Sequence, residues 1–185
     1  MEEHAEPLPP KFPLRITIYH AAQDDPKKNT ALRLKRRGFA RIVTRTRFLP
    51  KRAIVLNPFG EIAFSPADRE RIQQFGLAAV DCSWEHAQKV MSTHVKGTSR
   101  CLPILIAGNP VNFGKLTKLT TAEAIAAALF IAGFKKEADD LLSIFTWGHS
   151  FFELNGVLLD NYAVAKDSGE IVEMQTKLLK AKKSS

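Results

Sequence analysis

The alternation of apolar and polar positions predicts where the strands of this chain lie. The first such segment, "LRITIYH" at 14–20, places Leu14, Ile16 and Ile18 at every second position between more polar neighbours. This is the period of a strand with one buried face. Short apolar runs that end near Gly, Pro or Asn predict further strands. They are "ARIVTRT" (40–46), "RAIVLNP" (52–58), "LAAVDCSW" (77–84) and "LPILIAG" (102–108).

Segments with helix start and stop signals lie between and after these strands. In "SPADRERIQQFG", Ser65 can cap a helix, Pro66 fits the first helical position and Gly76 ends it. In "TTAE", Thr120 and Glu123 form a capping box in front of the apolar helix "AIAAALFIAG". Further helices are expected in a short basic segment that stops at Gly38 and in 84–95, 135–148, 149–165 and 168–183.

The order of these segments predicts an α/β protein in two parts. Alternating strands and helices argue for a largely parallel sheet covered by helices. After the strand expected at 102–108, every further element is a helix. We therefore divide the chain into a flexible N-terminus (1–12), an α/β lobe (13–101), and a loop with an all-helical lobe (102–185).

Composition describes a globular chain with excess positive charge. Of 185 residues, 45% are hydrophobic, and 27 Lys and Arg against 19 Asp and Glu give a formal net charge of +8. This surplus favours a polyanionic partner. No apolar run has the length of a membrane span, and the acidic first residues lack the basic start of a signal peptide. We expect a cytoplasmic protein that does not contact membranes.

Positive charge is concentrated in one stretch of the chain. Eleven basic residues lie between Lys27 and Arg52, and no Asp or Glu occurs between Asp25 and Glu61. A surface with only positive charges can contact phosphates, so this stretch predicts RNA or DNA binding. The alternative is a solvated basic face that aids solubility. The candidate RNA contacts are Lys28, Arg33, Lys35, Arg36, Arg37, Arg41, Arg45, Arg47 and Arg71.

The residues that bind metals in other proteins have no suitable spacing here. Cys82 and Cys101 predict two buried thiols, with a disulfide between them as the alternative. The five histidines show no ligand spacing, so we expect no metal. A Gly-rich dinucleotide turn, a P-loop and a zinc-binding HExxH are all missing from the sequence.

Three loops follow the carboxyl ends of expected strands, where open parallel sheets bind their ligands. They are "NPFGE" (57–61), "DCSW" (81–84) and the Asn-, Pro- and Gly-rich segment after Ile106. Together they predict one apolar cleft with exposed backbone groups and one acid. A planar heterocycle would fit between Trp84 and Leu56.

Five motifs in order carry a resemblance to a known family. "DPKKNT", "LNPFGEIAFSPADR", "DCSW", "LPILIAGNPVNFGKLTKLTTAEA" and "FTWGHSFFELN" resemble the small-subunit rRNA aminocarboxypropyltransferases of archaea and eukaryotes. The similarity covers nearly all of 14–163. It implies a SPOUT-like α/β fold with a trefoil knot, in which a largely parallel N-terminal sheet lobe and an all-helical C-terminal lobe are joined through a knotted loop. Phe113 stands where the family motif has Tyr, and Leu116 where it often has Pro.

The resemblance also implies a reaction. Members transfer the 3-amino-3-carboxypropyl group of S-adenosylmethionine to N3 of a uridine or N1-methylpseudouridine in small-subunit rRNA, and release methylthioadenosine. The implied partner is this rRNA or a pre-ribosomal particle, and the implied state is a monomer. Two alternatives stay open: a SPOUT-type RNA methyltransferase, which would use the same cofactor, and an rRNA-binding assembly factor without activity.

Carried over residue by residue, the resemblance implies a set of cofactor contacts. Apolar walls would come from Leu56, Pro58, Trp84 and Ala87. Backbone groups near Leu102 and Thr117 would read the adenine edge, and Thr30 with the Thr120 and Thr121 backbone would hold the methionine carboxylate, an anion suited to a helix start. Asp81 is the catalytic candidate, acting beside the sulfonium or the uridine imide; a helix cap at the strand end is its alternative role.

Overall fold

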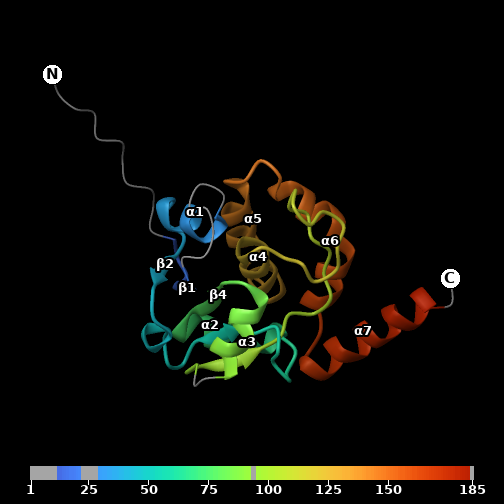
Figure 1. The fold of residues 1–185 in the computed structure, drawn as a ribbon. Helices are drawn as coiled ribbons and strands as arrows, with labels where there is room; N and C mark the ends of the chain where they lie inside the picture. The colour runs from blue at the N-terminus through green and yellow to red at the C-terminus, as the bar shows by residue number, and fades with distance from the viewer. Residues whose placement is uncertain (1–11, 22–28, 93–94, 184–185) are drawn as a thin grey trace.

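A five-stranded, wholly parallel sheet forms the centre of the protein (Figure 1). The computed structural model describes residues 12–21, 29–92 and 95–183. The strands lie in the order β2-β1-β4-β3-β5. Their bounds are β1 Ile16–His20, β2 Arg41–Val43, β3 Ile54–Leu56, β4 Leu77–Asp81 and β5 Thr98–Arg100. The predicted α/β class with a parallel sheet is therefore confirmed.

Helices cover both faces of this sheet. Their bounds are α1 Thr30–Arg36, α2 Arg69–Phe75, α3 Trp84–Ser92, α4 Thr121–Ile131, α5 Lys135–Ser143, α6 Gly148–Ala163 and α7 Ser168–Lys183, with short 3-10 turns at Thr46–Phe48 and Pro66–Asp68. The predicted capping box of Thr120 with Glu123 forms, and Ser65, predicted as a cap, forms a capping box with Asp68 at the 3-10 turn Pro66–Asp68. Gly76 ends α2 with φ of 88°, a left-handed conformation that favours glycine. None of the described helices is long and apolar enough to cross a bilayer.

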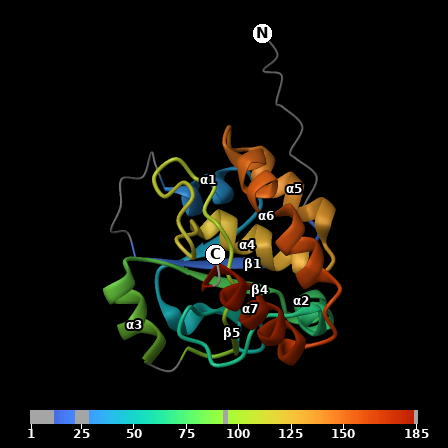
Figure 2. The ribbon, with the colours of Figure 1, turned by 90° about the vertical axis from the view of Figure 1, so that its right-hand side faces the viewer.

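The alternation along the strands decides which face each side chain joins. Ile16 and Ile18 of β1, with Leu77 of β4, pack into the main core with α1, α2 and α4. Val55 and Ala78 point to the other face, into a smaller cluster beside α3, and α3 lies on the opposite side of the molecule from α5 and α6 (Figure 2). The main core continues without interruption into the helices that follow α4. The division into lobes at residue 101 stays a prediction.

The prediction of a strand at 102–108 is wrong, and the hydrogen bonds of this segment's backbone show why. This segment is alternately buried but joins no strand of the sheet, and it is bound by side chains of α6 and α7. The Asn155 amide brackets Ile106, accepting from its N–H at 2.7 Å and donating to its carbonyl at 2.7 Å. The Tyr162 hydroxyl donates to the Ile104 carbonyl at 3.0 Å, and the Ile104 N–H donates to Gln175 Oε1 at 2.9 Å. Helix side chains thus bind one side of this segment, and on the other side it pairs with 115–117 only through an isolated antiparallel bridge between Ile106 and Leu116.

The other differences from the prediction concern the last strand and the residues at which helices begin and end. The fifth strand is the polar triplet Thr98–Arg100, which pairs with β3 at the sheet edge. The helix expected over 135–148 ends at Ser143, and α6 begins at Gly148. A Cβ on Gly148 would contact the Leu142 carbonyl oxygen, because the chain folds tightly back on α5 there. The turn between the two helices therefore occupies 144–147, which the prediction includes in the first helix.

Candidate active site

A cavity of about 750 Å³ lies where the carboxyl ends of β3 and β4 meet the start of α4. Each of the three loops expected to form a cleft contributes to it, through Asn57 and Pro58, through Asp81 and Cys82, and through Asn109. The first residues of α1 and α4 close its sides. Its size falls in the range of about 300–1,000 Å³ that is typical of small-molecule sites.

The structure places the predicted cofactor contacts together, although they come from distant parts of the chain. Asp81 lines the cavity between them. Trp84 begins α3, and its side chain lies outside what the structure describes. The predicted residues that line the cavity are Thr30, Leu56, Pro58, Ala87, Leu102, Thr117, Thr120 and Thr121.

Asp81 joins the ends of three elements at the cavity wall. Its Oδ2 atom lies 2.8 Å from His20 Nδ1 at the end of β1 and accepts a hydrogen bond of 2.8 Å from Asn29 Nδ2. Its Oδ1 atom accepts from the Thr121 hydroxyl at 2.8 Å. Asn29 also caps α1, since its Oδ1 accepts from the Leu32 N–H at 2.9 Å. This carboxylate therefore holds β1, α1 and α4 in fixed positions around the cavity.

Glu123, which is fully buried at the start of α4, organises the loop that precedes this helix. Its carboxylate accepts hydrogen bonds from the Gly108 N–H (2.7 Å), the Asn109 N–H (2.9 Å) and Asn109 Nδ2 (2.8 Å). It also accepts from the N–H and the hydroxyl of Thr120, at 2.7 and 3.1 Å. The Thr120 N–H is therefore already bound to Glu123. Of the two amides predicted to hold an anion, those of Thr120 and Thr121, the Thr121 N–H is the one that can face it, since a first-turn amide has no intrahelical acceptor.

The loop between 105 and 118 is folded back on itself. The Ala107 N–H donates to the Lys115 carbonyl at 2.9 Å, and the Gly114 N–H donates to the Ala107 carbonyl at 2.8 Å. Thr117 adopts a φ of 60°, which is uncommon for a residue other than glycine. Its N–H donates to the Leu105 carbonyl at 2.9 Å. The backbone group that Thr117 can offer to a ligand is therefore its carbonyl.

Both cysteines border the cavity, and no disulfide joins them in the described structure. Partial burial raises the pKa of the Cys101 thiol above its ordinary value. Its Sγ atom lies 3.7 Å from the Pro58 carbonyl oxygen and 3.5 Å from that of Leu102. The described residues contain no group of three or more His, Cys, Asp or Glu side chains that could hold a metal ion.

Most of the predicted RNA contacts gather around the β2 edge of the sheet. The exposed ones, on α1, β2 and the turn that follows, are Lys35, Arg36, Arg37, Arg41, Arg45 and Arg47. Arg33 is half-buried, with its guanidinium 5.1 Å from the centre of the Phe145 ring. Arg71 is exposed on α2, beside Arg52 and the amino-terminal end of β3, far from the cavity end of the strands. Lys28 lies outside the described residues.

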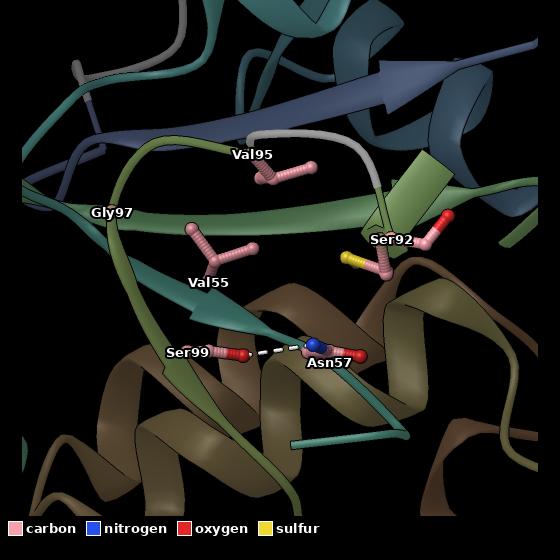
Figure 3. A pocket seen from close by; sticks show the side chains of 7 residues that line it. Val55, Asn57, Ser92, Val95, Gly97 and Ser99 are labelled. Carbon is pink, nitrogen blue, oxygen red and sulfur yellow. Dashed lines mark hydrogen bonds between the residues drawn. The ribbon is translucent and has the colours of Figure 1, made fainter. Parts of the chain in front are cut away.

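A second, smaller cavity of about 280 Å³ lies on the α3 face of the sheet. Figure 3 shows Val55 and Val95 beside the pair formed by Asn57 and Ser99, whose side chains are joined by a hydrogen bond of 2.8 Å. The described residues that line it include no titratable side chain. The larger cavity is therefore the better candidate for chemistry.

Sequence reasoning missed several residues that shape the site. His20 is not among the predicted site residues, and Asn29 and Asn155 stand in two of the quoted motifs, "DPKKNT" and "FTWGHSFFELN", without a predicted role. His20 lies directly opposite Asp81 in the register of β1 and β4, a relation that becomes visible only when the two strands are paired. Glu123 was expected to cap α4, but its role in holding the loop was not.

Comparison with known proteins agrees with this architecture. The family described as "Ribosome biogenesis protein, C-terminal" matches residues 54–179. A 16S rRNA aminocarboxypropyltransferase of Methanosarcina acetivorans is 49% identical over 87% of this chain and 92% of its own length. The corresponding protein of Methanothermobacter thermautotrophicus is 46% identical over 90% of this chain and 99% of its own.

A solved structure shares the fold. The SAM-dependent rRNA:acp-transferase Tsr3 from Vulcanisaeta distributa superimposes with a TM-score of 0.81 at 42% identity, over 88% of this chain and 89% of that one. The sequence matches and the structural match therefore agree over almost the whole length of the described fold. This chain belongs to the 16S rRNA aminocarboxypropyltransferase family.

Proposed function

We propose that this chain transfers the 3-amino-3-carboxypropyl group of S-adenosylmethionine to N3 of a uridine or N1-methylpseudouridine in small-subunit rRNA during ribosome maturation. Family membership supports the reaction type, since the relatives are named for it. The observation that carries the proposal is the single cavity formed by the predicted cofactor contacts, which come from α1, β3, α3 and the loop before α4.

The chemistry sets what the cavity must do. N3 of the base forms a bond to the γ-carbon of the transferred chain, the bond from that carbon to sulfur breaks, and its electron pair stays on sulfur in the released methylthioadenosine. The N3 proton is lost from the base. A sulfonium activates all three carbons attached to it. The protein's residues therefore select the product by deciding which of these carbons faces the RNA.

The lining of the cavity supports a division of roles. Leu56, Pro58 and Ala87, with Trp84 at the start of α3, would bury the adenine and the methyl group against apolar surface. Leu102 and the Thr117 carbonyl would read the adenine edge. These contacts leave the amino acid end for the opposite side of the cavity.

The amino acid end would lie near the starts of α1 and α4. The Thr30 side chain and the Thr121 amide would hold its carboxylate. Asp81, which already accepts three hydrogen bonds, would act by its charge and by positioning its neighbours rather than by taking the N3 proton.

Trp84→Ala should abolish S-adenosylmethionine binding in calorimetry while leaving RNA affinity unchanged. Equal loss of both would contradict separate sites.

The basic surface at the β2 edge would bind the rRNA backbone. It begins at α1, whose first residues line the cavity, so RNA held there can reach the reacting group. The double variant Arg36→Ala with Arg37→Ala should weaken RNA binding and reduce the slope of log affinity against log salt by about 1–2 units. Lys135→Ala with Lys136→Ala removes the same charge from α5 and should leave the slope unchanged.

The reaction is tested by labelling. The protein is incubated with small-subunit rRNA and S-adenosylmethionine that carries the label on the methyl or on the carboxyl carbon in parallel reactions. We expect carboxyl label in the RNA and no methyl label. Methyl label alone would make the protein a methyltransferase, and neither label on free rRNA or on a pre-ribosomal particle would leave a binding protein.

Three further features belong to this proposal. A trefoil knot is supported by the resemblance. It is also supported by the path of the chain, which leaves the edge strand β5 and returns so that α4 packs against β4 and α1. Tracing residues 55–120 in an experimental density map tests it. A monomer is supported because one chain supplies the whole described lining of the cavity, and light scattering tests it. A cytoplasmic site, where ribosomes mature, is tested by fractionation.

A further inference from the structure

The loop at 110–118 exposes apolar side chains beside the cavity. The exposed fraction is 82% for Val111, 59% for Phe113 and 40% for Leu116. Val111, Asn112 and Thr117 of the same loop line the cavity itself. Single exposed apolar residues are common on protein surfaces, whereas a group of them at the rim of a cavity marks a place of contact.

The loop is held in place by hydrogen bonds rather than by packing of these side chains. The Asn112 N–H donates to Asn109 Oδ1 at 3.0 Å, and Asn109 is itself fixed by the buried Glu123. The Lys115 N–H donates to the Asn112 carbonyl at 2.9 Å. The apolar side chains are therefore presented to solvent by an ordered backbone, so a partner that covers them would bear little of the entropy cost of ordering the loop.

The charges around the loop indicate the nature of that partner. Lys115 and Lys118 are exposed and follow Phe113 within five residues. From 86 to 122 the sequence contains no Asp or Glu. An exposed aromatic ring accompanied by positive charge is the combination with which proteins bind unpaired nucleotides, through stacking on the ring and contact with phosphates.

We propose that Phe113 stacks on the unpaired target uracil, while Lys115 and Lys118 contact the adjoining phosphates. This inference rests on the function proposed above, because it assigns the base acceptor of the same cavity. N3 of the unpaired base must be directed at a reactive carbon in the cavity, so the enzyme needs a surface on which the ring of that base can rest. The rim position of the loop, next to Asn112 and Thr117, provides that surface.

The test couples a protein change to an RNA change. One hairpin of small-subunit rRNA carries the uridine that accepts the carboxyl label, and a second carries an abasic nucleotide at that position. Phe113→Ala should weaken binding of the first hairpin by about 5- to 150-fold, the range measured for removal of one stacked base. It should change binding of the abasic hairpin by less than about twofold, because the abasic hairpin has already lost the stacked base.

Three controls make the result specific. Phe113→Tyr keeps an aromatic ring and should retain wild-type binding of the uridine hairpin. Val157→Ala removes an even more exposed apolar side chain from α6, away from the cavity, and should change nothing. S-adenosylmethionine affinity should be the same in Phe113→Ala and wild type, since Phe113 is outside the cavity lining.

Two outcomes would overturn the inference. If Phe113→Ala weakened both hairpins equally, the ring would contact another part of the RNA. If it weakened neither, but reduced binding to a pre-ribosomal particle, the loop would contact a ribosomal protein. In both cases wild-type protein would still transfer carboxyl label, whereas failure of the proposed function would appear as no such transfer by the wild type.

Discussion

The two walls of the cavity are built in different ways. In the sheet wall, formed by the ends of β3 and β4, parallel strands hydrogen-bond one another's backbone, and β4 also pairs with β1. In the loop wall, residues 101–120, much of the backbone is held by the side chains of Glu123, Asn155 and Tyr162. A strand ladder survives the replacement of any one side chain. The loop wall should depend on single residues.

Glu123→Ala should give the largest effect. Five hydrogen bonds to the carboxylate disappear, and buried donors of Gly108, Asn109 and Thr120 lose their acceptor. We expect the free energy of unfolding to fall by about 3–5 kcal/mol in urea denaturation. Glu153→Ala, on the exposed side of α6, is the matched control and should cost less than about 0.5 kcal/mol. Similar losses in both variants would refute the role of Glu123.

Asn155→Ala should have the next largest effect. Its amide makes three hydrogen bonds, two to Ile106 and one to the Phe151 carbonyl at 2.8 Å. We expect a loss of about 2–3 kcal/mol, because the buried groups of Ile106 are left without partners. Hydrogen exchange at the Ile106 amide should accelerate, while exchange in β1 stays slow. Asn161→Ala, exposed on the same helix, should leave the Ile106 amide protected.

Asp81→Asn tests the sheet wall and should cost less, about 1 kcal/mol. The asparagine keeps one acceptor oxygen, and β4 remains paired with β1 and β3 along its length. Asp139→Asn, exposed on α5, provides the reference value in the same denaturation experiment. A loss as large as that of Glu123→Ala would mean that the sheet wall also depends on a single side chain, and the contrast between the walls would be wrong.

Tyr162→Phe should have the smallest effect at neutral pH, about 0.5 kcal/mol for its one hydrogen bond to Ile104. Its pH dependence is more informative, because burial raises the pKa of Tyr162 from 10.0 to about 12. The stability linked to the neutral hydroxyl is fully present below pH 10 and is lost between pH 10 and about 12, where the unfolded tyrosine ionises first. The difference between wild type and variant should shrink over this interval; a constant difference would contradict the assignment.

The sequence predicts strands well where hydrophobic alternation and a neighbouring strand coincide. β1 and β4 satisfy both conditions and were found within a few residues of their ends. The segment at 102–108 satisfies only the first, since alternation reports burial and not the identity of the hydrogen-bond partner. β5 satisfies only the second: Thr98, Ser99 and Arg100 form an edge strand with polar side chains that leave no apolar signal.

The residues of the site also fall into those that the sequence predicts and those that it does not. Residues in recognisable motifs, such as Thr30, Pro58 and Thr121, were singled out from the sequence, and the structure places them on one cavity; their contacts with a ligand stay a prediction. His20 and Asn155 could not be found, because their importance depends on which strand is paired in which register and on which helix borders the loop.

The dependence of the loop wall on α6 and α7 fixes when the cavity can be completed during synthesis. Residues 102–108 leave the ribosome about 50 residues before Asn155 and about 70 before Gln175, which bind their backbone. At the synthesis rate of about 5–20 residues per second, the nascent chain spends several seconds with a sheet but no finished binding wall. A nascent chain whose α6 and α7 have not yet docked therefore lacks the hydrogen bonds that hold residues 104–106 beside the cavity.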